Sequence, residues 1–500
     1  MRFSGQVDEA GFAQSANKDT SGRYHSNWLN MMYPRLFLAR NLLREDGVIF
    51  VSIDDHEVHN LRHLMDEVFG EENFVAQILW RKRSSPPNDK IIGATHDYII
   101  CFARDTDKVF LNLRARTEEQ RARYKNPDDH TRGPWTSGDL MANVKGGRYV
   151  ASLHFAITNP TTGEDHYPGL NGNWRFSRDT IARLIRNDEI YFGEDGLGRP
   201  KLKRFLSTVK DGVTYPTIWD FVPLNTRGTE EMAELLGDMR AFENPKPVGL
   251  LRELTELGGA PDAIILDFFA GSGTTAQAVL ELNAKDSGHR KFILVQLPEK
   301  TDNPKFPTIA DIARERVRRV IAKLADGEKA KAENEVQATI PLTLALSREG
   351  RGDSPPSNDK DGEQDRGFRA FRLAASNFRV WDPSAGDAKT LEEQIVLHAD
   401  NVNGAAASGA LLYELILRAG LPVSARVVRV ALDGAAAFDV NAGELMVCVE
   451  DSITLPLMRQ MIAHKPKKIV CLDKAFAGDD AAKTNARLEA ESHGVVFQTA

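Results

Sequence analysis

Residues 266–279 read LDFFAGSGTTAQAV and combine an acid, two closely spaced glycines and two threonines. Glycine lets the backbone make a tight turn and lets a ligand approach the main chain closely. An acid at the end of an apolar run, here Asp267, can hydrogen-bond such a ligand or orient the N–H groups of the turn. The pattern favours binding of a nucleotide-like molecule against the start of a helix, where free N–H groups point outward.

Two well-known nucleotide-binding turns can be compared with these residues. A phosphate-binding P-loop has Lys and then Ser or Thr after its last glycine, whereas Thr274 and Thr275 follow Gly273 here, so the P-loop is excluded. A dinucleotide-binding turn has the pattern G-x-G-x-x-G/A, which Gly271, Gly273 and Ala276 satisfy. The glycines alone therefore leave a nicotinamide cofactor open.

The order of the predicted strands separates the remaining alternatives. The turn lies between a predicted strand at 263–268 and a predicted helix from Thr274, and a further strand is expected at 291–297. Two more apolar runs, at 47–53 and 97–103, lie upstream and have the Val and Ile content of strands buried on both faces. Because a dinucleotide fold begins with its glycine turn and builds the sheet afterwards, this order predicts a circularly permuted α/β sheet instead.

Several stretches resemble the modification (Mod) subunits of type III restriction-modification systems, which are β-class amino-directed DNA methyltransferases. FAGSG at 269–273 fits the FxGxG segment of that class, and NPKP at 244–247 is similar to the family motif just upstream of it. The stretches at 22–57, 69–82 and 367–383 also read like family sequence. The resemblance spans nearly the whole chain apart from a low-complexity insert.

The resemblance implies a fold, a reaction and a cofactor. The fold would be α/β, with a permuted Rossmann-like methyltransferase sheet that is incomplete, an inserted DNA-recognition domain and a C-terminal α+β domain. The reaction would be methyl transfer from S-adenosyl-L-methionine to adenine N6 of DNA, and the choice of adenine N6 over cytosine N4 depends on the resemblance alone. The residues expected to bind the cofactor are Lys246, Pro247, Asp267, Phe269, Ala270, Gly271, Gly273, Thr274 and Gln296.

Length and composition predict several domains, because 500 residues exceed what one core normally holds. A segment rich in charge, Gly, Pro and Ser separates the last of them and should act as a linker. The expected divisions are the methyltransferase domain in two parts at 1–105 and 236–329, a target-recognition domain at 106–235, a flexible linker at 330–366 and a C-terminal assembly domain at 367–500.

The charge distribution indicates where nucleic acid would bind. The chain has a net charge of −7, yet the block from Arg81 to Lys210 contains 23 Lys plus Arg against 16 Asp plus Glu, interleaved with aromatic residues. Such a mixture suits phosphate contacts and base stacking. We expect double-stranded DNA to bind there, with Arg81, Lys82 and Arg83 among its contacts, and the resemblance adds a homodimer and the restriction (Res) subunit as partners.

Other classes of site are disfavoured. Three scattered cysteines are too few for a disulfide framework, which together with the lack of a membrane span or secretory signal predicts a cytoplasmic protein. His56, His59 and His63 have helical spacing but not that of a zinc protease, so a polar helix face is the better interpretation and no metal is expected.

The residues that would carry out methyl transfer are not evident. An exocyclic amine needs acceptors for its hydrogens and an aromatic face for the flipped base, and the family supplies both with an Asp-Pro-Pro-Tyr segment. No such segment occurs in the 500 residues, so the catalytic residues are unknown and a strand-bearing N-terminal portion is expected to be missing. The alternative hypothesis is a non-catalytic DNA-recognition and assembly subunit, or an inactive fragment of such an enzyme.

Overall fold

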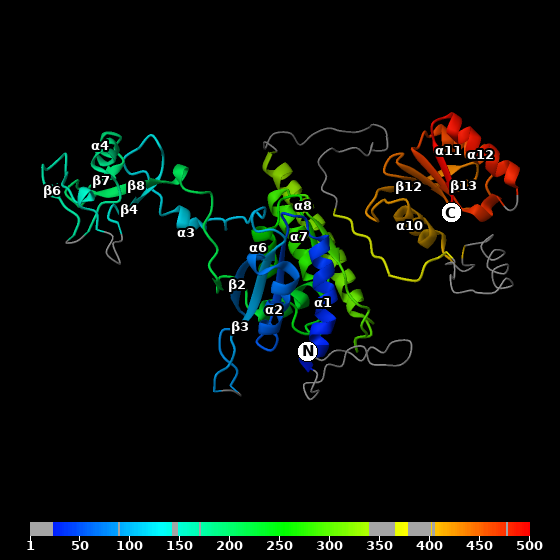
Figure 1. The fold of residues 1–500 in the computed structure, drawn as a ribbon, viewed down its shortest axis with the longest axis horizontal. Coiled ribbons are helices and arrows are strands. Elements are labelled where there is room, and N and C mark those ends of the chain that lie inside the picture. The colour runs from blue at the N-terminus through cyan, green and yellow to red at the C-terminus, as the bar shows by residue number, and fades with distance from the viewer. Residues whose placement is uncertain are drawn as a thin grey trace. The chain divides into compact units, whose positions relative to one another are not determined.

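The computed structural model describes residues 24–88, 91–142, 149–169, 172–339, 366–378, 402, 406–476 and 479–500 (Figure 1). The chain divides into two compact units, Met1–Arg366 and Gly367–Ala500. The second unit begins at the residue where the sequence places the start of the C-terminal domain. Both units combine helices with β-sheets, as expected for a mixed α/β protein.

A four-stranded sheet in the order β1-β3-β2-β9 forms the first part of unit 1. Strand β3 pairs antiparallel with both β1 and β2, and β2 pairs parallel with β9. Helices α1 and α2 pack on this sheet in one core cluster, and α6 packs in another. The elements are α1 (Tyr24–Leu42), β1 (Val48–Ile53), α2 (Val58–Phe69), β2 (Phe74–Arg81), β3 (His96–Ala103), β9 (Ile218–Trp219), α5 (Asn225–Leu236) and α6 (Val248–Gly258).

The glycine turn lies in a separate two-stranded parallel sheet. Strand β10 (Ile264–Asp267) precedes the turn, helix α7 (Thr274–Asp286) follows it, and β11 (Lys291–Leu294) pairs with β10. The predicted strand, turn and helix are therefore confirmed, and the helix begins at the expected residue. Helix α8 (Ile309–Thr339) packs against α7 and α5.

Strands β1 and β10, which lie in different sheets of unit 1, are both edge strands. Within the described part of the chain, β1 pairs only with β3, and β10 pairs only with β11. The expectation that 47–53 is buried on both faces is wrong: β3 is buried along most of its length, whereas β1 is mostly half-buried. In the second sheet, Ile264 is 65% exposed and Ile293 is 51% exposed. The physical reason is that neighbouring backbone and side chains cover β3 from two sides but β1 and β10 from only one.

An insertion with its own core lies between β3 and β9. Its elements pack around a cluster that contains Leu140, Trp174 and Ile181, distinct from the clusters of the main sheet. Two small antiparallel sheets, β4-β8-β7 and β5-β6, belong to it. The elements are α3 (Glu118–Arg121), β4 (Trp135–Gly138), β5 (Ile157–Thr158), β6 (Asp165–His166), α4 (Arg178–Arg186), β7 (Ile190–Tyr191) and β8 (Lys201–Phe205).

The two connections to the insertion run side by side. Arg114 and Val213 form an antiparallel bridge with both backbone hydrogen bonds, and Arg116 Nη2 donates to Lys210 O at 2.6 Å. These two paired connections are called the neck of the insertion. On the sheet side of the neck, Asn112 forms hydrogen bonds with the end of α6. The ends of the predicted recognition range 106–235 thus pack with the methyltransferase sheet, since β9 extends that sheet and α5 packs on α8.

Helix α8 continues to Thr339, past residue 330 where the linker was expected to begin. The sequence there lacks apolar periodicity but is rich in Ala, Lys and Glu, which are strong helix formers. The expected start of the linker is therefore wrong. Its remaining residues, 340–365, lie outside the described residues.

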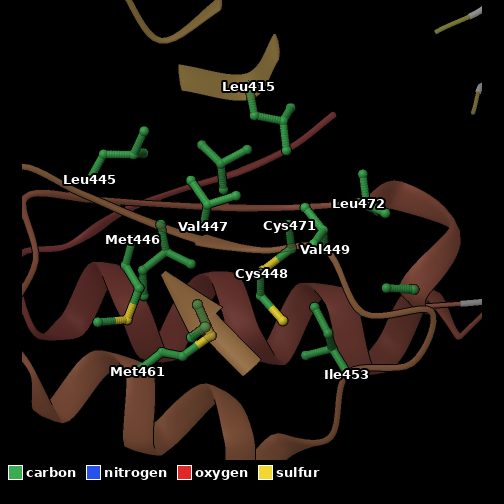
Figure 2. Close-up of a cluster of buried hydrophobic side chains, with 14 of the residues drawn as sticks. Leu415, Leu445, Met446, Val447, Cys448, Val449, Ile453, Met461, Cys471 and Leu472 are labelled. Atoms are coloured by element: carbon green, nitrogen blue, oxygen red, sulfur yellow. The ribbon is translucent and has the colours of Figure 1, made fainter. Parts of the chain in front are cut away.

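Unit 2 contains a five-stranded sheet in the order β12-β13-β14-β15-β16, antiparallel in its first half and parallel in its second. Figure 2 shows its core, where side chains of β14 and β15 point between the helices and the sheet. This sheet and its helices agree with the α+β class expected for the C-terminal domain. The elements are α10 (Ser408–Arg418), β12 (Val427–Leu432), β13 (Ala435–Val440), β14 (Leu445–Cys448), α11 (Leu455–Ala463), β15 (Lys468–Cys471), α12 (Asp480–Ser492) and β16 (Val496–Thr499).

The cysteines behave as small apolar core residues. Cys101, Cys448 and Cys471 are buried and free, and burial raises the pKa of the Cys101 thiol to about 12. Cys448 and Cys471 are register partners on adjacent strands and appear together in Figure 2. Among the helices of the described residues, none has the length and apolar character required to cross a membrane.

We predict that Trp174→Ala destabilises the insertion by about 3–5 kcal/mol, because it removes a large side chain from a packed core. Trp174 is 3% exposed, and its Nε1 donates to Phe155 O at 2.8 Å. Urea denaturation followed by circular dichroism measures the change. The matched control is Tyr149→Ala in the same insertion, where the ring is 49% exposed and the expected effect is within about 0.5 kcal/mol. Equal losses in the two variants would contradict a core role for Trp174.

Candidate cofactor site

Asp267, at the end of β10, holds the turn that follows it. Its Oδ1 accepts a hydrogen bond from Phe269 N at 3.1 Å, and its Oδ2 accepts from Thr275 Oγ1 at 2.5 Å. The carboxylate therefore ties the end of the strand both to the turn and to the first turn of α7. Of the two roles considered for this acid, the geometry supports the one in which it orients the turn.

Gln296, just beyond β11, supports the turn from the neighbouring strand. Its Oε1 accepts from Gly271 N at 2.8 Å, and its Nε2 donates to Leu297 O at 3.2 Å. Ala270 N donates to Val295 O, which adds a backbone bond between the same two segments. Gln296 therefore shapes the turn through its amide and has its hydrogen-bonding groups engaged with the protein.

Both glycines of the turn adopt a left-handed backbone. Gly271 has φ +52° and Gly273 has φ +79°, a region that residues with a Cβ rarely adopt. A Cβ placed on Gly273 would lie 3.3 Å from the backbone and Cβ of Ala313 in α8. Gly273 caps α7, so the first amides of a 13-residue helix face the turn. These features fit a site at which a ligand meets main-chain N–H groups.

The hydroxyl of Thr274 points into the protein rather than toward a ligand. Thr274 is 5% exposed, and Ser272 is 2% exposed. Nη1 of the fully buried Arg316 donates to Thr274 Oγ1 at 2.8 Å and lies 2.9 Å from Ser272 Oγ. Thr274 can therefore offer a ligand its backbone N–H but not its side chain.

Phe269 is the side chain of the turn that is available to a ligand. Its ring is 51% exposed, packs against Phe268 with centroids 5.3 Å apart, and has the guanidinium of Arg35 at 5.9 Å. Phe268 in turn packs on the core cluster of α1, α2 and β1. An exposed ring fixed beside a helix start provides a flat apolar face for a heterocyclic ligand.

Phe242, which lies two residues before the segment at 244–247, approaches the glycine turn. A Cβ on Gly271 would lie 3.2 Å from Phe242 Cζ. Pro247 is buried and caps α6. Helix α5 approaches this segment so closely that a Cβ on Gly228 would lie 2.1 Å from Pro245 O. The structure therefore brings Phe242, just upstream of the expected segment, to the glycine turn, and packs Pro245 against α5.

Lys246 is part of an ion cluster around a buried acid, with its own side chain 37% exposed. Its Nζ lies 3.0 Å from Asp97 Oδ2 and 4.8 Å from the centroid of Trp80. Lys82 Nζ contacts the other carboxylate oxygen of Asp97 at 2.6 Å. Because Asp97 is only 6% exposed, both lysines neutralise a buried charge. Their ammonium groups are therefore engaged with the protein.

The expected DNA contacts differ in their surroundings. Lys82 is occupied by Asp97, whereas Arg81 and Arg83 are exposed, and Arg81 Nη2 donates to Ser84 O at 2.9 Å. The aromatic residues of the basic block divide into two groups. Trp135 and Trp174 are at most 5% exposed and cannot stack on bases, whereas Tyr149 and Tyr167 are each 49% exposed.

The histidines near α2 take part in protein contacts. His56 Nδ1 lies 3.0 Å from Asp54 Oδ2, and the ring of His59 packs edge-on against His25 at 6.2 Å. Within the described residues no group of His, Cys, Asp and Glu side chains has a metal-binding arrangement.

Sequence reasoning missed Arg316, Gln277 and Glu231 as parts of the site. A signal was present for Arg316, because it falls on the apolar stripe of α8 formed by Ile312, Ala313, Val317 and Val320. A charged residue at such a position must be paired inside the protein. Gln277 and Glu231 carried no comparable signal, since polar residues on amphipathic helices are usually exposed.

Comparison with known families assigns the class of protein. Residues 10–301 match the model of a DNA methylase family, so the chain belongs to that family. The turn at Asp267–Thr275 and strands β1, β2, β3, β10 and β11 all lie within this range. Individual proteins that are similar in sequence to this chain narrow the comparison further.

The chain is similar to modification subunits of type III restriction-modification enzymes. It is 37% identical over 311 residues to the StyLTI Mod subunit of Salmonella typhimurium, which covers 60% of this chain and 46% of that protein. It is 31% identical over 341 residues to the EcoP15I Mod subunit of Escherichia coli, covering 60% and 52%. The chain thus spans about half the length of the curated relatives it matches.

Solved structures give a weaker comparison. A putative DNA modification methylase from Thermus thermophilus, complexed with S-adenosyl-L-methionine, is 15% identical with a TM-score of 0.28, covering 61% of this chain and 82% of that chain. The cytosine-N4-specific PvuII DNA methyltransferase is 14% identical with a TM-score of 0.29, covering 62% and 82%. These scores are too low to support an argument about the site.

We predict that Asp267→Ala lowers the free energy of unfolding of unit 1 by roughly 1–3 kcal/mol, because Phe269 N and Thr275 Oγ1 lose their acceptor. Urea denaturation provides the measurement. The control is Asp262→Ala, an exposed acid shortly before the same strand, which should change stability by less than about 0.5 kcal/mol. If both variants unfold at the parent's urea concentration, Asp267 does not hold the turn.

Proposed function

We propose that this chain is the modification subunit of a type III restriction-modification system, an adenine-N6 DNA methyltransferase that uses S-adenosyl-L-methionine. The observation that carries the proposal is the turn Asp267–Thr275, in which two left-handed glycines present the start of α7 beside the exposed ring of Phe269. Membership of the DNA methylase family and similarity to Mod subunits support the reaction and the biological system.

The cofactor would occupy the face of the turn opposite Arg316. Phe269 and Ala270 would contact it directly, the glycines and Thr274 would offer main-chain atoms, and Asp267 and Gln296 would keep those atoms in place. The bound cofactor supplies a sulfonium-linked methyl group. Lys246 and Pro247 would bound the site from the upstream segment, with the Lys246 ammonium fixed on Asp97.

The acceptor side of the reaction requires a further strand. The edges of β1 and β10 are open within the described residues, and Phe268 at the end of β10 packs in the same cluster as Ile53 at the end of β1. We propose that a strand pairing between these edges carries the acceptor for the target amine. An Asp-Pro-Pro-Tyr segment, which the family places on such a strand and which the 500 residues lack, has the required chemistry.

The insertion bounded by the Arg114–Val213 bridge is the proposed DNA-recognition domain. Its independent core allows it to present side chains without disturbing the cofactor site. The exposed Arg81 and Arg83 would add phosphate contacts next to it, whereas Lys82 would act structurally through Asp97. We further propose that unit 2 serves assembly, with a second copy of the chain or a restriction subunit as partner and the cytoplasm as the site of action.

We predict that the chain binds S-adenosyl-L-methionine and that Gly273→Val weakens the affinity at least about tenfold, because a β-branched residue cannot adopt φ +79° beside Ala313 without moving the turn. Isothermal titration calorimetry measures both dissociation constants. Gly237→Val is the matched control: Gly237 has φ +71° at the end of α5 but has open space around it and lies outside the turn.

The control separates general strain from a local effect. Both variants carry a valine in a left-handed conformation, but only Gly273→Val alters the turn. Unchanged affinity in a folded Gly273→Val protein would place the cofactor elsewhere. An equal loss in the two variants would mean that the effect arises from destabilisation.

We predict that the purified 500-residue chain transfers no detectable methyl group from labelled S-adenosyl-L-methionine to DNA, because the described edges lack the strand with the amine acceptor. Fusion of a family segment that contains Asp-Pro-Pro-Tyr before residue 21 should restore adenine methylation. The control fusion carries Ala in place of the Asp of that motif. The proteins must come from a host without DNA methyltransferases of its own.

The results of this assay also decide between the two functions considered. Methylation by the active fusion alone supports the enzyme. A chain that binds DNA and partners but stays inactive in every fusion favours the non-catalytic recognition and assembly subunit. Methylation by the unmodified chain would show that a residue already present accepts the target amine.

A further inference from the structure

Arg316 is a fully buried cation beneath the glycine turn. It lies on the face of α8 that packs against α7 and α5, with a relative exposure of 0%. Its Nη1 is within hydrogen-bonding distance of Ser272 Oγ, Thr274 Oγ1 and Met232 Sδ, and its Nε donates to Gln277 Oε1 at 2.8 Å. One side chain thus connects the turn, the first two turns of α7 and helix α5.

Burying a charge in such a position costs free energy unless the charge is paired or hydrogen-bonded. Nη2 is buried without a partner among the described residues, and burial lowers the pKa of the guanidinium to about 10. Glu231 and Glu281 oppose that effect through their negative charge. Arg316 is therefore still protonated at neutral pH, and it keeps its donors directed at the turn.

Glu231 holds the start of α6 and feels the charge of Arg316, while its ion pair is with Arg227 at 3.5 Å. It lies on α5, and its Oε2 accepts from Val248 N at 2.9 Å, which caps the start of α6 directly after Pro247. Burial raises the pKa of Glu231, while Val248 N–H and the charge of Arg316 lower it. Glu231 thus holds the start of α6, and Arg316 holds the glycine turn.

We propose that Arg316 is a positioning residue for S-adenosyl-L-methionine: by donating to Ser272 and Thr274 on either side of Gly273, it holds the turn in its binding conformation. The inference rests on the proposed function for its ligand, but the contacts on the turn do not depend on that ligand. Without the guanidinium, two buried hydroxyls lose their donor and the left-handed glycine between them loses its restraint.

The first test needs no ligand. Hydrogen exchange measured by mass spectrometry compares the parent chain, Arg316→Met and Arg319→Met. Arg319 lies one turn further along α8, its side chain is 43% exposed, and it pairs with Glu315. We expect Arg316→Met to increase exchange at least tenfold in peptides covering 268–277, with α2 and unit 2 unchanged, and Arg319→Met to leave the turn as in the parent. Unchanged exchange at the turn in folded Arg316→Met would overturn the proposal.

The second test measures cofactor affinity in a mutant cycle. Arg316→Met should raise the dissociation constant for S-adenosyl-L-methionine at least tenfold, and Arg316→Lys, which keeps the charge and one donor, should recover part of the loss. The pair Ser272→Ala with Thr274→Val should weaken binding as well. Adding Arg316→Met to that pair should then change affinity by less than about threefold, because the contacts it would remove are already gone.

Each outcome separates the two proposals. Arg316→Met could instead raise the dissociation constant by the same factor with and without the Ser272→Ala and Thr274→Val changes. That result would show that Arg316 acts by some route other than the two hydroxyls and would overturn the inference. A parent chain that binds no S-adenosyl-L-methionine would overturn the proposed function, while the exchange experiment would still decide whether Arg316 holds the turn. If Arg316→Met does not fold, Arg316→Lys takes its place in both experiments, with the same directions and smaller changes expected.

Discussion

A buried guanidinium needs acceptors for its hydrogens, and the acceptors of Nη1 and Nε of Arg316 fix the arrangement around the glycine turn. The acceptors of Arg316 come from the turn, from α7 and from α5, so these elements must keep their mutual positions for the charge to be tolerated. Asp267 and Gln296 hold the same turn from the strand side. The backbone of the glycine turn is thus held from two sides without a ligand. This reduces the conformational entropy that the turn would lose when a ligand binds.

The arrangement of strands in unit 1 is the second constraint on function. Strand β3 has a neighbour on each side and is nearly completely buried, while β1 and β10 each have one neighbour among the described residues; β1 is mostly half-buried and β10 exposes Ile264. An open edge leaves backbone N–H and C=O groups available to pair with another strand. The cofactor turn is complete without that strand, because all its supports come from β10, β11, α7 and α8. Under the proposed function, cofactor binding would therefore not depend on the strand that methyl transfer requires.

Local sequence predicted the features that depend on local conformation. The strand, turn and helix around Gly271 and Gly273 follow from an apolar run, two glycines and a helix-forming segment, and the helix begins at Thr274 as expected. Helix α8 was harder to delimit, because a lack of apolar periodicity after residue 330 indicates exposure and not a loss of helix. The antiparallel pairing of β1 with β3 also depends on contacts between distant segments, which an apolar run does not specify.

Side-chain roles at the site were less predictable than the backbone. Glycine, Asp267 and Phe269 were identified because their types have few uses at a tight turn. Lys82 and Lys246 were expected to face ligands, but the structure places both on the buried carboxylate of Asp97, which lies far from Lys246 in the sequence. Asp97 and Lys246 are 149 positions apart, so the residue spacing around either one does not indicate that they pair. Such pairs become visible only when the sheet brings their segments together.

The neck formed by Arg114 and Val213 has an evolutionary consequence. The chain leaves the methyltransferase sheet and returns to it through two backbone segments joined by a bridge, so the ends of the insertion are separated only by the width of a strand pair, about 5 Å. Any folded segment whose ends lie that close together can replace the insertion without stretching the sheet. Because the insertion also has its own core, recombination at this neck would exchange a whole folded domain in one event and leave the glycine turn unchanged. Under the proposed role of the insertion in DNA recognition, new sequence preferences would arise in this way.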